Sequence, residues 1–256
     1  MFRPRVIPCL LLKDKGLVKT IQFNAPTYVG DPMNAVKIFN DAKADELVFL
    51  DITATIEGRA PNIDIIKEIG EEAFMPFAVG GGINHIDHVK QLISAGTEKV
   101  IINSAAIENP PFIKEIAELY GRQSIIVSID VKNENGKYNI HTHSGKKQHK
   151  LDLCETIQKL EDSGAGEIMI NSIDNDGMQQ GYDTDLIKLV SSNVQIPVIA
   201  IGGAGCYEDL SIAVTNGAAS ASAAGSIFVF IGKNRAVLIN YPDEEELQDL
   251  FVNLQN

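Results

Sequence analysis

The sequence lacks an excess of positive charge. Its 256 residues include 22 Lys and Arg against 34 Asp and Glu, which gives a formal net charge of −12 at pH 7. Nucleic acids and anionic membrane surfaces both require a basic face on the proteins that bind them. The charge balance therefore argues against nucleic acid and membranes as partners.

Cysteines and long apolar runs are also scarce. Cys9, Cys154 and Cys206 are odd in number, far apart and without a CxxC pair, so neither a disulfide framework nor a zinc site is indicated. The apolar run Val6–Leu12 contains Pro8, is too short to span a membrane and lacks a small-residue cleavage site. We expect a cytoplasmic protein, and the sequence indicates neither a metal nor a cofactor.

The clearest positive feature is an internal repeat. Glu46 pairs with Glu167 at an offset of 121 residues, and the glycines that follow later strands repeat at the same offset. At the front of each half the offset is 119, which aligns Leu11 with Asp130. One half thus carries a carboxylate at the end of its first predicted strand, and the other carries a leucine.

Short β-branched runs alternate with amphipathic stretches along the chain. The predicted strands are Val6–Leu12, Glu46–Asp51, Pro76–Val79, Lys99–Asn103, Ile125–Asp130, Glu167–Asn171, Pro197–Ile201 and Ala218–Ala223. The predicted helices are Pro32–Ala44, Asn62–Glu72, His85–Ala95, Pro110–Tyr120, Leu151–Ser163, Thr184–Ser192 and Tyr207–Asn216. Eight strand–helix units in two similar (βα)4 halves predict a parallel (β/α)8 TIM barrel of the α/β class. We expect it to be one domain over residues 1–256, and a doubly wound sheet is the structural alternative.

Several residues mark the ends of these helices. Asp31 before Pro32 is a typical helix start, and the acidic stretch 243–246 suits the first turn of a last helix. Gly96 and Gly217 each follow a helix, where glycine suits a left-handed stop. The connections 13–29 and 131–150 exceed the usual length, and the second predicts a hairpin over Lys137–His143. They are either loops that cover a substrate or mobile surface insertions.

Glycines end the third and seventh predicted strands, at residues 80–82 and 202–203, and small residues follow at 103–105 and 223–226. Glycine lets a backbone approach a ligand, and free N–H groups at a helix start attract anions. Barrels commonly bind phosphate with the loops after strands seven and eight. Because the device occurs twice, we expect two phosphate sites on opposite sides of the barrel mouth. The alternative is that the glycines only serve tight turns.

Charged residues mark the starts of four predicted strands, namely Arg5, Glu46, Lys99 and Glu167. Lone charges inside a barrel would be costly, but two cations and two anions neutralise each other. The pattern fits a polar plug or gate at the bottom of the barrel, and it fits a structural salt-bridge layer equally well.

Two weaker signals concern histidine and cysteine. His141, His143 and His149 have a spacing compatible with a metal, but no fourth ligand is apparent, so we expect an exposed hairpin face instead. No base near Cys9 would activate its thiol, and we expect Cys9 to line the core.

Together these residues resemble HisF, the cyclase subunit of imidazole glycerol phosphate synthase, over essentially the whole chain. The matching stretches include Glu46-Leu-Val-Phe-Leu-Asp-Ile-Thr-Ala54, Val79-Gly-Gly-Gly-Ile83, Ser144-Gly-Lys-Lys147, Gly164-Ala-Gly-Glu167, Asp176-Gly177, Gly181-Tyr-Asp183 and Gly202-Gly-Ala-Gly205. The resemblance implies a glutaminase partner, HisH-like, at the N-terminal barrel face. It further implies that ammonia from that partner passes a charged gate and follows the barrel axis to a bisphosphorylated nucleotide at the top.

The resemblance also assigns roles to individual residues. It maps the ammonia gate onto Arg5, Glu46, Lys99 and Glu167. It maps the two sites for phosphate, or for a phosphorylated small molecule, onto Gly82, Asn103 and Ser104 and onto Asp176, Gly177, Gly203 and Ser226. Lys19 and Asp51 match as well. Of the two catalytic aspartates of the family, one is Asp130, and the other is replaced by Leu11.

This replacement is chemically large. Ammonia addition and ring closure need proton transfers, and loss of a well-placed acid or base removes about 10²–10⁴-fold in rate. Asn171 and Met178 stand where the family usually has threonine, and Ile201 where it has serine. The predicted cyclase end is therefore more apolar, while the predicted gate is intact.

The stretch Cys9-Leu-Leu-Leu-Lys13 is similar to that of a HisF-like subgroup associated with surface-polysaccharide biosynthesis. The resemblance implies delivery of ammonia to a separate sugar amidotransferase, which converts an acetamido group to acetamidino. Two further hypotheses stay open. The chain is a working histidine-pathway cyclase in which Asp130 alone suffices, or a non-catalytic scaffold that activates its glutaminase. Whether the chain is itself an enzyme is left open by its sequence.

Overall fold

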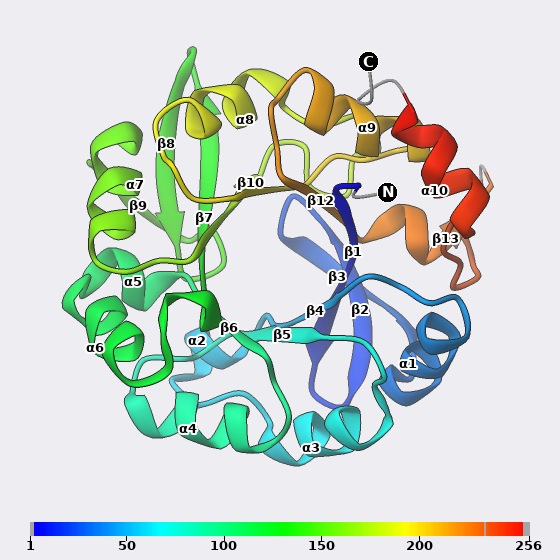
Figure 1. Ribbon diagram of the computed structural model, residues 1–256, viewed down its shortest axis with the longest axis horizontal. Helices are drawn as coiled ribbons and strands as arrows, with labels where there is room; N and C mark the ends of the chain where they lie inside the picture. The colour runs from blue at the N-terminus through cyan, green and yellow to red at the C-terminus, as the bar shows by residue number, and fades with distance from the viewer. Residues whose placement is uncertain (1–2, 233, 253–256) are drawn as a thin grey trace.

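Eight parallel strands form a closed barrel in the computed structural model, which describes residues 3–232 and 234–252. In order around the barrel they are β1 (Arg5–Lys13), β4 (Leu47–Asp51), β5 (Phe77–Gly80), β6 (Lys99–Ile102), β7 (Ile125–Glu134), β10 (Glu167–Ser172), β11 (Val198–Ile201) and β12 (Ala221–Ala224). Every neighbouring pair is parallel. Pairing of Arg5 with Ala221 joins β12 to β1 and closes the ring (Figure 1). The predicted (β/α)8 barrel is confirmed, and the open-sheet alternative is wrong.

Helices surround this ring, as Figure 1 shows. The longer ones are α1 (Pro32–Asp41), α3 (Ile63–Glu72), α4 (Ile86–Ser94), α6 (Pro111–Tyr120), α7 (Leu153–Asp162), α8 (Thr184–Ser191), α9 (Tyr207–Thr215) and α10 (Glu244–Leu250). Shorter turns are α2 (Ala54–Glu57), α5 (Ser104–Glu108), η1 (Arg122–Ser124) and η2 (Ser226–Phe228). All seven helices predicted between strands are present, each within a few residues of its expected bounds.

The predicted helix ends are confirmed at three places and wrong at one. The Asp31 carboxylate accepts a hydrogen bond from Asn34 N at 3.0 Å, and Asp243 forms a capping box at the start of α10. Gly96 has a φ of 94°, which is the left-handed conformation that glycine favours. Gly217 does not adopt it. A Cβ there would lie 2.6 Å from the carbonyl oxygen of Ala213, so close packing explains this glycine.

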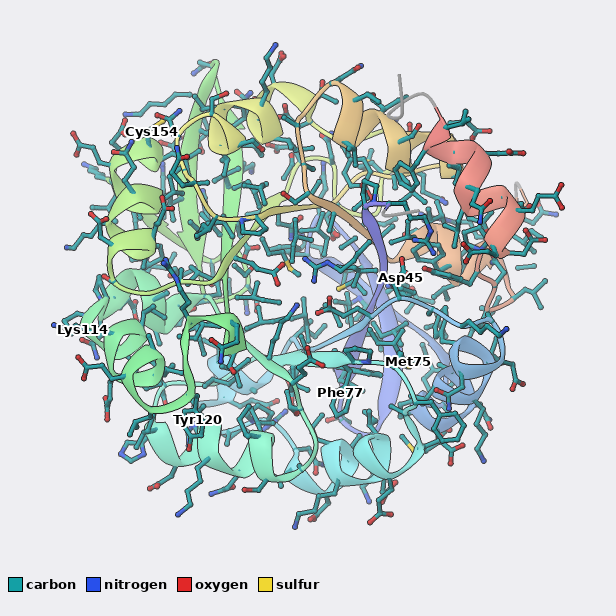
Figure 2. All side chains as sticks on the ribbon, viewed as in Figure 1. Asp45, Met75, Phe77, Lys114, Tyr120 and Cys154 are labelled. Carbon is teal, nitrogen blue, oxygen red and sulfur yellow. The ribbon has the colours of Figure 1, made fainter. Side chains whose placement is uncertain are left out.

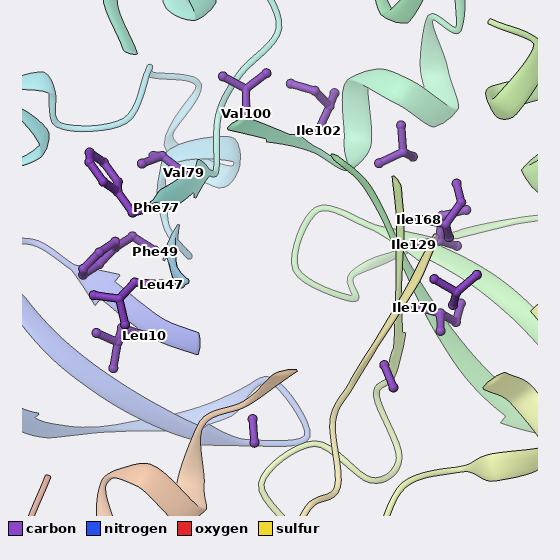
Figure 3. Close-up of a cluster of buried hydrophobic side chains, with 14 of the residues drawn as sticks. Leu10, Leu47, Phe49, Phe77, Val79, Val100, Ile102, Ile129, Ile168 and Ile170 are labelled. Atoms are coloured by element: carbon purple, nitrogen blue, oxygen red, sulfur yellow. The ribbon is translucent and has the colours of Figure 1, made fainter. Parts of the chain in front are cut away.

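The barrel wall separates two apolar layers because side chains alternate across each strand. On β1, Leu10 and Leu12 belong to the layer between strands and helices, whereas Ile7 and Cys9 belong to the layer inside the barrel. Figure 3 shows the outer layer, where Phe49 and Phe77 extend away from the barrel axis. Their rings pack edge to face, with the ring centroids 6.3 Å apart. Burying each such side chain contributes about 1.5–3 kcal/mol.

Hairpins replace the two long loops that the sequence predicts. Residues 13–29 contain β2 (Gly16–Ile21) and part of β3 (Asn24–Gly30), and β2 pairs antiparallel with β1. In the second half, β7 runs on to Glu134 and pairs with β8 (Lys137–Thr142), which pairs with β9 (Lys147–His149). A small hairpin of β13 (Phe230–Ile231) and β14 (Ala236–Val237) follows the barrel. The hairpin predicted over Lys137–His143 is confirmed by β8, which pairs with β7 and β9. The hairpin in the first connection was not predicted, and it forms because ladder hydrogen bonds continue beyond the barrel rim.

Candidate functional site

A cavity of about 260 Å³ opens at the C-terminal end of the barrel. Leu11 and Asp130 both line it, and their strands, β1 and β7, are four positions apart around the ring of eight. The half-barrel repeat therefore brings these two residues to opposite walls of one cavity. The aligned pair forms an asymmetric mouth, with a carboxylate on one side and a leucine on the other.

Asp130 sits in an environment made by amides. Asn171 Nδ2 donates to its Oδ1 at 3.3 Å, and Asn103 Nδ2 donates to its Oδ2 at 3.1 Å. Burial raises the pKa of Asp130 to about 7, aided by the charge of Asp176 and opposed by the hydrogen bonds from the two amides. A carboxyl group near half-protonation at neutral pH can give or accept a proton.

The contact between Asp130 and Asn171 follows from strand register. Asn171 on β10 lies directly beside Asp130 on β7, so the two side chains point to the same side of the sheet. Sequence reasoning recognised Asn171 only as a departure from the family threonine. Its role as a donor to Asp130 was missed, although both residues end predicted strands that follow each other along the chain.

The three residues predicted for the first phosphate site are only partly brought together. Asn103 and Ser104 line the cavity, but Gly81 lines it in place of Gly82. The backbone N–H of Gly82 donates to Thr55 Oγ1 at 3.1 Å, and the Ser104 hydroxyl accepts from the His143 backbone at 3.1 Å. An anion bound here would have to compete with both contacts.

The second predicted phosphate site is more complete. Asp176, Gly177, Gly203 and Ser226 all line the cavity, and they follow strands β10, β11 and β12, opposite the first site. Gly177 has a φ of 72°, and a Cβ there would lie 2.2 Å from the carbonyl oxygen of Thr20. Glycine is required at this position because the loop packs directly against β2.

Hairpin residues complete the mouth. Lys19 on β2 is buried, and its Nζ donates to the carbonyl oxygen of Cys9 at 2.6 Å. Burial lowers the pKa of Lys19, against the charges of Cys9 and Asp176. Cys9 itself lies in the inner layer, as predicted, and burial raises the pKa of its thiol to about 12. The Asp51 carboxylate is held by Arg59 at 2.6 Å, a contact that sequence reasoning missed.

The four charged residues at the strand starts form a closed ring. Arg5 bonds Glu46 and Glu167, each at 2.5 Å. Lys99 Nζ lies 2.7 Å from Glu167 and 3.3 Å from Glu46. Each cation thus bridges both carboxylates, at the N-terminal end of the barrel. Beside the ring, Asp45 (labelled in Figure 2) accepts from the backbone N–H of Val6 at 2.8 Å and fixes the start of β1.

The ring shifts the proton affinities of its members. Burial raises the pKa of Glu167, but the hydrogen bonds and charges of Arg5 and Lys99 outweigh it, so the pKa lies below its usual value. Burial likewise opposes the charge on Arg5, and Glu167 and Glu46 outweigh it to raise the pKa. Both Glu167 and Arg5 therefore stay ionised at neutral pH.

Between the ring and the mouth, the barrel interior is apolar. Its buried side chains include Ile7, Val48, Ala78, Ile101, Ile126, Met169, Ile199 and Ala221. Such a lining offers no hydrogen bonds, so a charged molecule would cross it at a far greater cost than a small neutral one. The charged ring and the cavity thus stand at opposite ends of one apolar interior.

The histidines of the second hairpin do not share one exposed face, which corrects the prediction. His141 is buried, and its Nδ1 lies 3.0 Å from the carbonyl oxygen of Gly145. Thr142 Oγ1 instead links the other two rings, at 3.0 Å from His143 and 2.8 Å from His149. Within residues 3–232 and 234–252, no group of three His, Cys, Asp or Glu side chains is placed to hold a metal ion.

Comparison with known proteins points to one family. Residues 5–233 match the model of a family described as histidine biosynthesis protein. The chain is 49% identical over 248 residues to a Pseudomonas aeruginosa protein provisionally named imidazole glycerol phosphate synthase subunit hisF2, covering 96% of this chain and 99% of the relative. It is 43% identical over 230 residues to imidazole glycerol phosphate synthase subunit HisF of Chlorobaculum tepidum, covering 90% and 92%. None of the helices described here is long and apolar enough to cross a membrane.

Proposed function

We propose that this chain, which belongs to the HisF family of histidine biosynthesis proteins, is the barrel subunit of a glutamine-dependent complex that channels ammonia. A HisH-like glutaminase would dock on the N-terminal barrel face and release ammonia at the charged ring. The ammonia would cross the apolar interior and leave at the cavity. It would then serve a separate sugar amidotransferase in acetamidino-sugar synthesis for surface polysaccharide.

One observation carries this proposal, namely that the ring of four charges is complete while a leucine stands opposite Asp130 at the other end of the barrel. Arg5, Glu46, Lys99 and Glu167 form a complete ring, but Leu11 faces Asp130 across the cavity. Ammonia is small and neutral, so it costs far less to bring into an apolar interior than the ammonium ion does. A leucine neither donates nor accepts the protons that cyclisation needs.

Two observations support acetamidino-sugar synthesis as the use of this ammonia. The stretch Cys9-Leu-Leu-Leu-Lys13 resembles that of the polysaccharide-associated subgroup. In addition, the names of several relatives at 43–49% identity are provisional. Both fit a branch of the family that kept the barrel and its ring for another ammonia acceptor.

Histidine-pathway cyclisation is the second candidate function. It is favoured by Asp130, whose pKa of about 7 suits acid–base work, and by the retained residues of the second phosphate site. It requires one carboxyl group to do the work of two. Ammonium-dependent turnover of the bisphosphorylated nucleotide at an ordinary enzymatic rate would establish this candidate in place of the first.

The decisive experiment combines the chain with a HisH-like glutaminase, the amidotransferase and an acetamido-sugar acceptor. Mixing should raise glutamine hydrolysis, and the ratio of acetamidino product to glutamate should be near one. Lys99→Ala and Glu167→Ala should keep hydrolysis but lower this ratio, because an opened ring leaks ammonia. Lys114→Ala on the exposed face of α6 is the matched control. Wild-type ratios in both ring variants would make the four charges a structural layer only.

A further inference from the structure

The hydrogen-bond ladder between β1 and β4 starts beyond the charged ring. The two strands pair from Cys9 and Val48 onwards. Pro8, just before Cys9, has no backbone N–H to donate to a neighbouring strand. Continued in the same register towards the ring, the pairing would place Val6 beside Asp45. Other groups must therefore hold the two strands together at this point.

Two side chains take up the backbone of Val6. The Asp45 carboxylate accepts from Val6 N at 2.8 Å. The hydroxyl of Tyr241 donates to the carbonyl oxygen of Val6 at 2.9 Å and accepts from the N–H of Asp45 at 3.4 Å. One hydroxyl thus bridges the two strands where a ladder bond would otherwise join them. The neighbouring residues on the two strands are Arg5 and Glu46, which form one ion pair of the ring.

Tyr241 reaches this bridge from outside the barrel strands. It lies between β14 and α10 in the chain. Its ring packs against Phe228 at a centroid distance of 5.5 Å, and edge to face against Phe39 at 6.3 Å. Burial raises the pKa of its hydroxyl, aided by the charge of Asp45, so the hydroxyl keeps its proton at neutral pH. The aromatic contacts hold the ring in place, and the ring in turn directs the hydroxyl at the strands.

Arg5 is the member of the charged ring that most needs such support. Its side chain is 30% exposed, whereas those of Glu46 and Glu167 are 3% and 10% exposed. An ion pair open to solvent contributes little unless its geometry is held. Arg5 is also the first residue of β1, so its position depends on where that strand begins relative to β4.

We propose that the Tyr241 hydroxyl is a positioning group for the charged ring. It holds the first residues of β1 and β4 at the spacing at which Arg5 reaches Glu46, and it thereby keeps the ring closed. This inference rests on the proposed function, in which a closed ring keeps ammonia from leaking. It gives the segment that follows the barrel a part in channelling, since Tyr241 acts through Arg5 without touching the ammonia.

Tyr241→Phe tests this role because it removes the hydroxyl and keeps the packed aromatic ring. Hydrogen exchange of the Arg5 guanidinium reports opening of the charged ring. It is followed by ¹⁵N NMR of the purified full-length chain, and the resonance is assigned by its loss in Arg5→Lys. Losing one hydrogen-bonding group shifts such an equilibrium by about 2–10-fold, so exchange at Arg5 should become faster by this factor. Exchange at Arg122, which bonds the carbonyl oxygen of Ala165, should stay unchanged. Wild-type exchange at Arg5 would overturn the proposal.

Tyr207→Phe is the matched control. The Tyr207 hydroxyl donates to Asn240, the residue before Tyr241, and its ring packs against Phe228 in the same aromatic cluster. The variant therefore loses a hydroxyl that holds the same segment, but it leaves the bridge between β1 and β4 in place. Exchange at Arg5 should match wild type. Equal acceleration in both variants would overturn the proposal, because loosening of the segment would then open the ring.

The complex with the glutaminase and the amidotransferase supplies a second readout. Tyr241→Phe should keep glutamine hydrolysis and raise the ammonia lost, measured as glutamate without matching acetamidino product, by about 2–10-fold. Tyr207→Phe should lose no more ammonia than wild type.

The two readouts separate this inference from the proposed function. A lowered product ratio in Lys99→Ala, with a wild-type ratio in Tyr241→Phe, would retain the channel and reject the inference. Faster exchange at Arg5 in Tyr241→Phe, with wild-type ratios in both variants, would retain the positioning role and reject the proposed function.

Discussion

Removing Lys99 should destabilise the barrel by an amount that the ring geometry sets. Lys99 Nζ contacts both Glu167 and Glu46, and its side chain is 12% exposed. Breaking a buried pair by deleting one partner costs about 3–5 kcal/mol. Here Arg5 continues to bond both carboxylates, so we expect a smaller loss, about 2–3 kcal/mol, for Lys99→Ala.

The pH dependence of this loss of stability follows from the pKa of Glu167. Its folded-state pKa is lowered from the ordinary value of 4.5 by Arg5 and Lys99 against the effect of burial. A carboxyl group with a depressed folded pKa stabilises the fold above its unfolded pKa, and this stabilisation is lost as pH falls through the folded pKa. The difference between wild type and Lys99→Ala should therefore be full at neutral pH and shrink below about 4.5.

Urea unfolding followed by circular dichroism, at neutral and acidic pH, measures both quantities. Lys114→Ala is the matched control, because Lys114 is 71% exposed and lies 3.9 Å from Glu118 one helical turn away. An exposed pair of this kind contributes about 0.3–0.5 kcal/mol. The electrostatic account of the ring would be refuted if Lys99→Ala lost no more stability than this control. It would also be refuted if the loss of stability were the same at both pH values.

Three further predictions concern the mouth. The wild-type barrel should show little ammonium-dependent turnover of the bisphosphorylated histidine-pathway nucleotide, and Leu11→Asp should recover part of the roughly 10²–10⁴-fold deficit in a steady-state cyclase assay. Burial raises the pKa of Asp130 from 3.8 to about 7, so the folded state keeps a proton that the unfolded state loses, and stability falls as pH rises between these values. Asp130→Asn should accordingly be more stable than wild type above pH 7, by up to about 4 kcal/mol, and little changed near pH 3.8 in urea unfolding. Inorganic phosphate at millimolar concentration should raise the melting temperature of the wild-type chain, and Gly203→Ala should abolish this shift, because a Cβ there would lie 2.2 Å from Gly181 O.

The alternation of strands and helices was predictable because it is local. A strand such as β11 must be apolar on both faces, and a helix such as α3 must show one apolar stripe. The two kinds of element therefore have different hydrophobic periodicities that can be recognised in the sequence. The half-barrel repeat then predicted that Leu11 and Asp130 meet across the mouth. The predicted strand starts indicated that four charges lie together at the other end of the barrel.

Local signals failed where packing decides. Gly217 looks like a helix stop, but glycine is needed there because the carbonyl oxygen of Ala213 approaches too closely for a side chain to fit. Residues 13–29 look like a loop, and only the pairing of β2 with β1 makes them strands. In the second connection the sequence indicated a hairpin over Lys137–His143, but not its pairing with β7. The predicted role of Gly82 in anion binding stays a prediction, and its N–H donates to Thr55, a partner distant in sequence that no local pattern indicated.

The sequence by itself determined the barrel, the two halves and the residue types at each end, since these depend on periodicity and on the order of elements. Only the tertiary structure decided which atoms meet. Lys99 reaches Glu46 and Glu167 across the barrel, and Asn103 and Asn171 share one carboxylate. Such contacts join strands that are far apart along the chain, and their distances depend on how the closed sheet tilts and packs, which no local pattern encodes.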